Sequence, residues 1–172
     1  MDDHDNLPEK YESAIAVVGM ACHLPGALNI DEYWSNLREG VESVKFLSDE
    51  ELLNAGETSV NIANPNYVKA QPVLENFDRF DAKFWGFGPQ DAAVTDPAHR
   101  IFLEVAYQAL EHSGHTGYDS EERVGVFATS GENLYRMNNL QSNPQLVSDM
   151  GEFLVRHTGN CMNFLATRFS YE

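Results

Sequence analysis

Hydrophobic residues in this sequence follow two patterns, short unbroken runs and stripes with helical spacing. Residues 14–18 form an unbroken apolar run with β-branched members that ends at Gly19, and residues 123–128 form a second, mostly apolar run. Runs of this length that end at a turn signal are typical of strands buried on both faces. We therefore expect one strand at each of these two places.

Helical spacing first appears between residues 31 and 39. Asp31 is a suitable N-cap for a helix here, and Gly40 suits a left-handed C-terminal stop. The apolar face of this predicted helix consists of Tyr33, Trp34 and Leu37. A second, shorter helix is predicted to start at Ser48, because two glutamates follow it where the helix dipole favours negative charge.

The best-specified helix of the chain lies between Asp96 and Gly114. Asp96 is a natural N-cap, Pro97 a natural first helical residue, and Gly114 a natural stop. Arg100 and Glu104 are one turn apart and are expected to pair on the surface. The apolar stripe of this helix is predicted to consist of Ile101, Phe102, Val105, Ala106, Ala109 and Leu110.

The remaining segments are mostly predicted as loops. Residues 56–76 lack periodicity, and one short strand is expected there around Val73. Residues 77–87 carry five large aromatic rings and are predicted to be a loop held against the core by those rings. Residues 132–144 are rich in asparagine and are expected to be a loop. Helix is expected in three further places: one or two turns at residues 89–94, an amphipathic stretch from residue 146 to residue 154, and the first part of residues 160–171.

Predicted strands alternate with helices along the chain, which is typical of the α/β class. Two strands are too few for a self-sufficient sheet of the usual width. We therefore expect an incomplete mixed sheet flanked by helices, belonging to a larger fold. The predicted organisation is a flexible N-terminal tail or linker at residues 1–12, followed by one truncated domain at residues 13–172.

Charge and cysteine usage narrow the class of protein. The chain carries 27 acidic and 11 basic residues, for a formal net charge of −16. Nucleic acids and anionic membrane surfaces need a basic face, so neither is expected as a partner. The acidity indicates either a soluble, self-repelling surface or a docking surface for a basic partner. An acidic N-terminus without a signal-like segment, and two cysteines expected to be free thiols, predict a cytoplasmic location.

Few residues suggest chemistry on their own. Cys22 and His23 are adjacent, but neighbouring residues of an extended chain point apart, so a packed cysteine is favoured over a nucleophilic pair. Cys161 is likewise expected to be a packed thiol near the start of a helix. The six histidines lack the spaced partners of a metal site, so no metal is expected. Ser130 and Gly131 follow a predicted strand without the lysine and further glycines of a phosphate loop.

Five segments in a fixed order resemble the N-terminal half of a modular polyketide-synthase ketosynthase, a beta-ketoacyl synthase. The resemblance covers residues 13 to 172, and its variants are most similar to ketosynthases of hybrid peptide–polyketide assembly lines. The five segments are IAVVGMACHLPGA at 15–27, YWSNLREG at 33–40, FDAKFWGFGP at 80–89, DPAHR at 96–100 with LEHSG at 110–114, and GN at 159–160 with FLATRFSY at 164–171.

This resemblance implies a thiolase-like fold and a homodimeric complete domain. It implies an acyltransferase that accepts an acyl chain from an acyl carrier protein and catalyses decarboxylative Claisen condensation in polyketide, typically antibiotic, biosynthesis. Substrates would arrive on the phosphopantetheine of carrier proteins, with no cofactor bound directly. By resemblance, the nucleophilic cysteine and both catalytic histidines would lie beyond residue 172, in a C-terminal half. The residues expected to line the acyl pocket are Ser130, Gly131, Glu132 and Asn133.

The sequence departs from the family pattern at three places. His23 and Gln90 stand where arginine is usual, and residues 161–163 interrupt a normally charged stretch. Three functions remain open at this point. The chain is part of an enzyme that is inactive alone, a non-catalytic docking or scaffold module of an assembly line, or a remnant without a function of its own.

Overall fold

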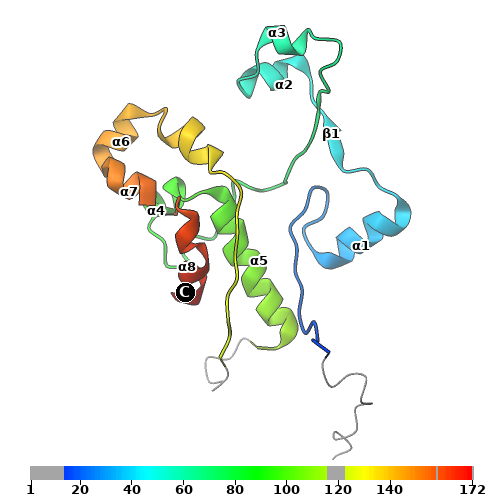
Figure 1. Cartoon of the computed structure of the whole chain (residues 1–172), viewed down its shortest axis with the longest axis vertical. Helices are drawn as coiled ribbons and strands as arrows, with labels where there is room; N and C mark the ends of the chain where they lie inside the picture. Colours follow the sequence, from blue (N-terminus) through cyan, green and yellow to red (C-terminus); the bar gives the residue numbers. More distant parts are fainter. Residues whose placement is uncertain (1–13, 116–122, 158, 172) are drawn as a thin grey trace, which may run out of the picture.

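The computed structural model describes residues 14–115, 123–157 and 159–171 of the chain. The expectation for residues 1–12 therefore lies outside the described part. Figure 1 shows α5 near the centre, α4, α7 and α8 gathered beside it, and the α1–β1–α2–α3 region projecting away from them. The elements are α1 (Ile30–Glu39), β1 (Val44–Phe46), α2 (Asp49–Asn54), α3 (Ser59–Ile62), β2 (Ala70–Pro72), α4 (Pro89–Val94), α5 (Pro97–Ser113), the π-helix η2 (Arg136–Leu140), α6 (Pro144–Met150), α7 (Glu152–His157), the 3₁₀-helix η3 (Met162–Phe164) and α8 (Leu165–Tyr171).

Helix α5 confirms the boundaries predicted from its end signals. The Asp96 carboxylate accepts a hydrogen bond from the Ala98 amide at 2.8 Å, and Pro97 opens the helix. Gly114 ends it with φ of 77°, in the left-handed region. The buried residues of the helix are His99, Arg100 and Leu103, whereas the predicted apolar stripe is only half-buried.

The predicted surface pairing of Arg100 with Glu104 is wrong. Arg100 is 8% exposed, and its guanidinium lies 6.0 Å from the ring centre of Phe80. The helix rotates this side chain towards the aromatic segment, because α5 packs against residues 80–87 on that side. No ion pair joins Arg100 to Glu104 within the described ranges.

Local capping defines the two earlier helices. Helix α1 starts one residue before the predicted N-cap, since the Asn29 carboxamide oxygen, and not Asp31, accepts from the Glu32 amide at 2.9 Å. Gly40 ends α1 with φ of 68°, as expected. Ser48 and Glu51 form a reciprocal capping box at the start of α2, which confirms the helix predicted there.

The two strands expected from apolar runs are not present as paired strands. Figure 1 shows residues 14–18 and 123–128 as stretched segments of chain, and neither has a β partner among the described residues. Ile15 is 95% exposed and Phe127 is 97% exposed. A strand needs a neighbour to accept its backbone hydrogen bonds, and the described chain supplies none at these positions.

The described sheet is instead a small antiparallel ribbon. β1 pairs with β2, with Val44 opposite Pro72 and Phe46 opposite Ala70. β2 ends one residue before Val73, where a short strand was predicted, whereas no pattern indicated β1. The chain thus combines helices with a small open sheet, in agreement with the predicted α/β class.

Some helical boundaries differ from those expected. α4 forms as predicted, but residues 56–76 also contain the short helix α3, and residues 132–144 contain η2. The amphipathic stretch from 146 to 154 is broken into α6 and α7 at Gly151, whose φ is 82°. The segment 160–171 begins with the 3₁₀ turn η3 and continues as α8.

The core lies where α4, η2 and α7 meet. Val94, Leu140 and Val155 form its centre, each at most 3% exposed. A second cluster surrounds Trp85, which is 7% exposed and contacts the rings of Phe84 and Tyr107 edge-on. The aromatic segment is therefore held against α5 by large rings, as predicted.

Among the residues that the structure describes, no helix has both the length and the hydrophobicity of a membrane span.

Candidate functional site

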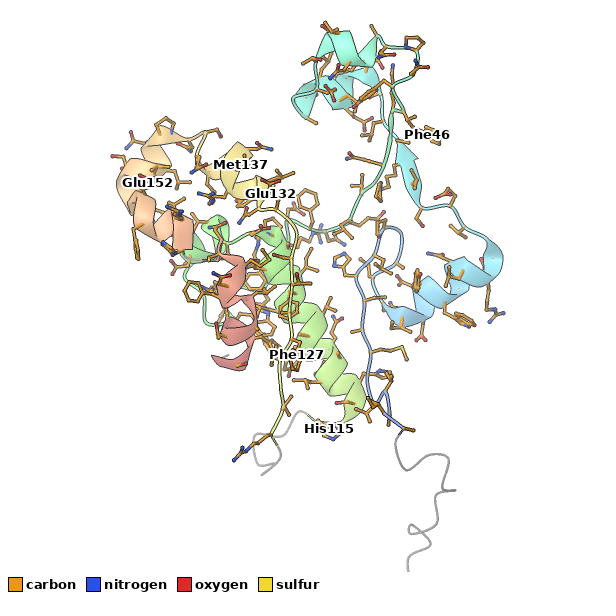
Figure 2. The ribbon with its side chains drawn as sticks, viewed as in Figure 1. Phe46, His115, Phe127, Glu132, Met137 and Glu152 are labelled. Carbon is orange, nitrogen blue, oxygen red and sulfur yellow. The ribbon has the colours of Figure 1, made fainter. Side chains whose placement is uncertain are left out.

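The four residues predicted to line a pocket lie around one cavity. This cavity has a volume of about 540 Å³, within the range of small-molecule sites. Figure 2 shows two of its lining residues, Glu132 on the segment that leads into η2 and Met137 on η2 itself. The lining consists of His99, Ser130, Gly131, Glu132, Asn133, Arg136, Met137, Arg156, His157, Asn160, Cys161, Met162 and Asn163.

An asparagine pair holds the wall of the cavity together. The Asn133 carboxamide nitrogen donates to the Asn160 side-chain oxygen at 3.0 Å and to the Asn160 carbonyl at 3.1 Å. The Asn133 oxygen accepts from the Arg136 amide at 2.7 Å, which fixes the start of η2. Residues 130–133, of which Gly131 and Glu132 are exposed and the other two half-buried, are thereby tied to the C-terminal segment.

Asn160 is the centre of this arrangement. It is 6% exposed, and its side-chain nitrogen donates to the Val94 carbonyl at 2.7 Å and to the Val155 carbonyl at 2.8 Å. These carbonyls belong to the last residue of α4 and to α7. A buried amide that satisfies carbonyls from two elements determines how those elements meet.

Gly159 brings the chain close to the junction of α4 and α5. Its φ is 66°, and a Cβ at this position would overlap the side chain of Thr95, which is fully buried. The Gly159 carbonyl accepts from the Asp96 amide at 3.0 Å. Only glycine satisfies both the left-handed conformation and this close approach.

Charge in the cavity comes mainly from basic side chains. Its cationic residues are Arg136 and Arg156, against the single carboxylate of Glu132, and His99 and His157 also line it. Burial lowers the pKa of His99, and Arg168 lowers it further, while Asp96 opposes the shift. His99 is therefore neutral at pH 7.

The two cysteines have different surroundings in the described structure. Cys161 lies at the cavity beside two histidines, but no hydrogen bond joins its thiol to an imidazole in the described part of the chain. Burial and the nearby Glu32 raise the pKa of Cys22, so its thiol is protonated at neutral pH. His23 donates from Nε2 to the Glu75 carbonyl at 2.8 Å. The His23 ring is thus engaged with a backbone carbonyl, and the Cys22 residue beside it is half-buried.

The histidines form no metal site within the residues described. No group of three His, Cys, Asp or Glu side chains is close enough to hold an ion there. His112 accepts at Nδ1 from the Met20 amide at 3.0 Å, and His115 contacts Ser113 at 3.0 Å. At the end of α5, His112 thus bonds the distant N-terminal segment, whereas His115 bonds its own neighbour.

Sequence reasoning did not select Arg136, Arg156 or His99 for the cavity. These residues lie on three separate helical elements, and only packing brings them together. Asn160 stood within one of the family-like segments, but its role was not predicted. Its position after Gly159, a glycine with left-handed backbone, was the available signal.

Comparison with known proteins identifies the family. The sequence model of the beta-ketoacyl synthase N-terminal domain matches residues 12–172. The chain therefore belongs to the beta-ketoacyl synthase family, with the thiolase-like fold of its ketosynthases, as the motifs indicated.

The relatives are polyketide synthases. A phenolphthiocerol/phthiocerol polyketide synthase of Mycobacterium tuberculosis is 42% identical over 165 residues, which are 93% of this chain and 11% of that protein. Ketosynthase twelve of the bacillaene polyketide synthase of Bacillus amyloliquefaciens has a TM-score of 0.66 at 34% identity, over 90% of this chain and 27% of that one. An oxazolomycin ketosynthase domain of Streptomyces albus has a TM-score of 0.66 at 28% identity, with the same coverage of 90% and 27%. The chain thus spans about a quarter of these ketosynthases and about a tenth of the mycobacterial synthase.

Proposed function

We propose that this chain forms the N-terminal scaffold and part of the acyl-pocket wall of a polyketide-synthase ketosynthase. The complete domain would accept an acyl chain from an acyl carrier protein and catalyse decarboxylative Claisen condensation. The single observation that supports this most strongly is the cavity of about 540 Å³ lined by Ser130, Gly131, Glu132 and Asn133. These are the same four residues that the family resemblance predicts to line the acyl pocket.

The proposed division of labour follows from the chemistry of the cavity. It offers hydrogen-bond donors, cationic groups and neutral His99, but no thiol paired with an imidazole among the described residues. The condensation requires a thiolate nucleophile and groups that stabilise developing negative charge. We assign the nucleophilic cysteine and the two catalytic histidines to a C-terminal half. Residues 13–172 would then make up the N-terminal part of the domain.

The partners follow from the same proposal. Carrier proteins would present substrates on phosphopantetheine, and the complete domain would be a homodimer. Large apolar side chains exposed on this chain, such as Trp34 at 59% and Phe127 at 97%, are consistent with further protein surfaces covering them. A cytoplasmic location fits the two free thiols of Cys22 and Cys161.

Acyl loading tests the proposal. The chain is co-expressed with a ketosynthase C-terminal half, and the pair is incubated with a hexanoylated acyl carrier protein. Intact mass spectrometry should show a hexanoyl adduct on the C-terminal half in the mixture, and none when either half is incubated separately. The control is a C-terminal half whose nucleophilic cysteine is replaced by alanine.

Two results would contradict the proposal in different ways. Hexanoyl transfer by this chain alone would show that it contains its own nucleophile. A stable complex that binds carrier protein but never loads would favour the alternative, a docking or scaffold module of an assembly line.

A further inference from the structure

The wall of the candidate acyl cavity is more cationic than a plain hydrocarbon chain requires. Arg136 of η2 and Arg156 of α7 both line it, and both also line a second cavity of about 190 Å³. The chain as a whole has a net charge of −16 with only 11 basic residues. Two of these 11 therefore converge on one cavity of a strongly acidic protein.

Neither arginine is neutralised by the carboxylates around it. Glu132 lines the larger cavity and Glu152 the smaller one, and Figure 2 shows these two side chains on separate segments. No ion pair forms between either glutamate and either arginine in the ranges that the structure describes. Arg136 as a whole residue is half-buried, and no carboxylate of the described ranges forms an ion pair with it.

Unpaired guanidinium groups at a partly enclosed site favour an anionic ligand. Guanidinium is planar, carries five N–H donors, and matches the oxygens of carboxylate and phosphate in a two-pronged geometry. Asn133 and Asn163 add polar groups to the lining, while Met137 and Met162 add apolar surface. Such a lining suits a ligand with an apolar body and a charged end.

We propose that this cavity binds an anionic group of the substrate through Arg136 and Arg156. The inference rests on the proposed function, and the shared chemistry is a carboxylate at the far end of the acyl chain or the phosphate of the pantetheine arm. A terminal carboxylate would make this ketosynthase selective for dicarboxylic acyl chains.

Calorimetric titration of the purified chain tests the proposal with four probes. Adipoyl-pantetheine carries a terminal carboxylate, hexanoyl-pantetheine is its uncharged match, 4′-phosphopantetheine carries only the phosphate, and free adipate lacks the pantetheine arm. We expect adipoyl-pantetheine to bind about tenfold more tightly than hexanoyl-pantetheine, as for a hydrogen bond to a charged group. Added salt should reduce this difference, because it screens charge.

The variants assign the effect to the cavity. Arg136→Gln and Arg156→Gln, singly and together, should lower the affinity for adipoyl-pantetheine to roughly that for hexanoyl-pantetheine. Arg38→Gln on exposed α1 is the matched control and should leave the difference between these two affinities unchanged. Arg156 is exposed, so its replacement should leave the circular dichroism spectrum and the melting curve unchanged.

The outcomes separate the two sources of negative charge and the two proposals. If the arginine variants lose the preference for adipoyl-pantetheine, the bound anion is the terminal carboxylate. If they bind only 4′-phosphopantetheine more weakly, the bound anion is the phosphate. Both results support the anion site. Equal binding of charged and uncharged probes by the unmodified chain, or unchanged binding in the double variant, would overturn it. Arginine-dependent binding of free adipate, with no binding of any pantetheine probe, would support the anion site and contradict the proposed function.

Discussion

The two parts of this molecule are stabilised in different ways. In the arm, residues 14–76, α1 has no buried residue, and α2 and α3 bury one residue each, Leu52 and Ile62. In the body, residues 77–115, 123–157 and 159–171, Leu103 is fully buried, and Val94 and Leu165 are 1% exposed. The arm therefore depends on end signals within its own helices, whereas the body depends on packing between distant segments.

The N-terminal segment contacts the body at the end of α5. The N-terminal segment approaches the end of α5 so closely that a Cβ at Gly19 would lie 2.8 Å from the Cβ of Ser113. The Met20 amide donates to His112 Nδ1 at 3.0 Å, which joins the N-terminal segment to the end of α5.

The largest contrast should come from removing a leucine side chain in each part. Leu103→Ala should lower the free energy of unfolding by about 2–5 kcal/mol, because it leaves a cavity in a fully buried site. Leu37→Ala in α1, where the side chain is 55% exposed, should change it by less than about 0.5 kcal/mol. Urea titration followed by circular dichroism measures both, and equal losses would show that the arm is packed as tightly as the body.

Two glycines near the cavity give the next contrast. Gly159→Ala should destabilise the body by roughly 1–3 kcal/mol, because it combines a left-handed backbone with overlap on Thr95. Gly131→Ala is the matched control, since nothing lies within 4 Å of its added Cβ. Thermal melts of the two variants measure the difference. A Gly159 variant as stable as the control would show that the chain relaxes freely there.

Capping should govern the arm more than any side-chain contact. Ser48→Ala removes both hydrogen bonds made by the Ser48 hydroxyl with Glu51, and should destabilise α2 by about 1 kcal/mol. Faster hydrogen exchange confined to the amides of α2 is the expected signature. Ser35→Ala on exposed α1, which removes only a side-chain bond to Glu39, should leave exchange nearly unchanged.

The smallest effect should be a pH dependence located in the body. Because burial lowers the pKa of His99 from its ordinary 6.5, the folded state disfavours its protonation. The contribution of neutral His99 to the free energy of unfolding is therefore complete above pH 6.5 and declines as the pH falls below that value. His99→Gln should flatten this part of the stability curve, whereas His115→Gln should not. An unchanged slope in the first variant would exclude His99 as the source.

The sequence predicted best where a structure is specified by a few neighbouring residues. The ends of α5 follow from Asp96, Pro97 and Gly114, and the start of α2 follows from Ser48. The apolar runs at 14–18 and 123–128 were misjudged, because strand formation requires a neighbouring strand that the run itself does not contain. The buried position of Arg100 was missed for a similar reason, since it depends on where Phe80 lies.

The candidate site shows the same division. Residues 130–133 were selected through resemblance alone, and their tie to Asn160 could not be read from spacing, because 27 positions separate it from Asn133. Arg136, Arg156 and His99 carry no distinctive local pattern and were not predicted as site residues.

By itself, the sequence determined the family, the helices with strong end signals and the acidic character of the chain. These depend on short motifs, on capping within a turn or two, and on composition. Only the tertiary structure decided which side chains line the cavity, which apolar runs lack a β-strand partner among the described residues, and which glycine lies close to Thr95. Those features arise from contacts between residues far apart in the chain, and a local pattern carries no information about its eventual neighbours.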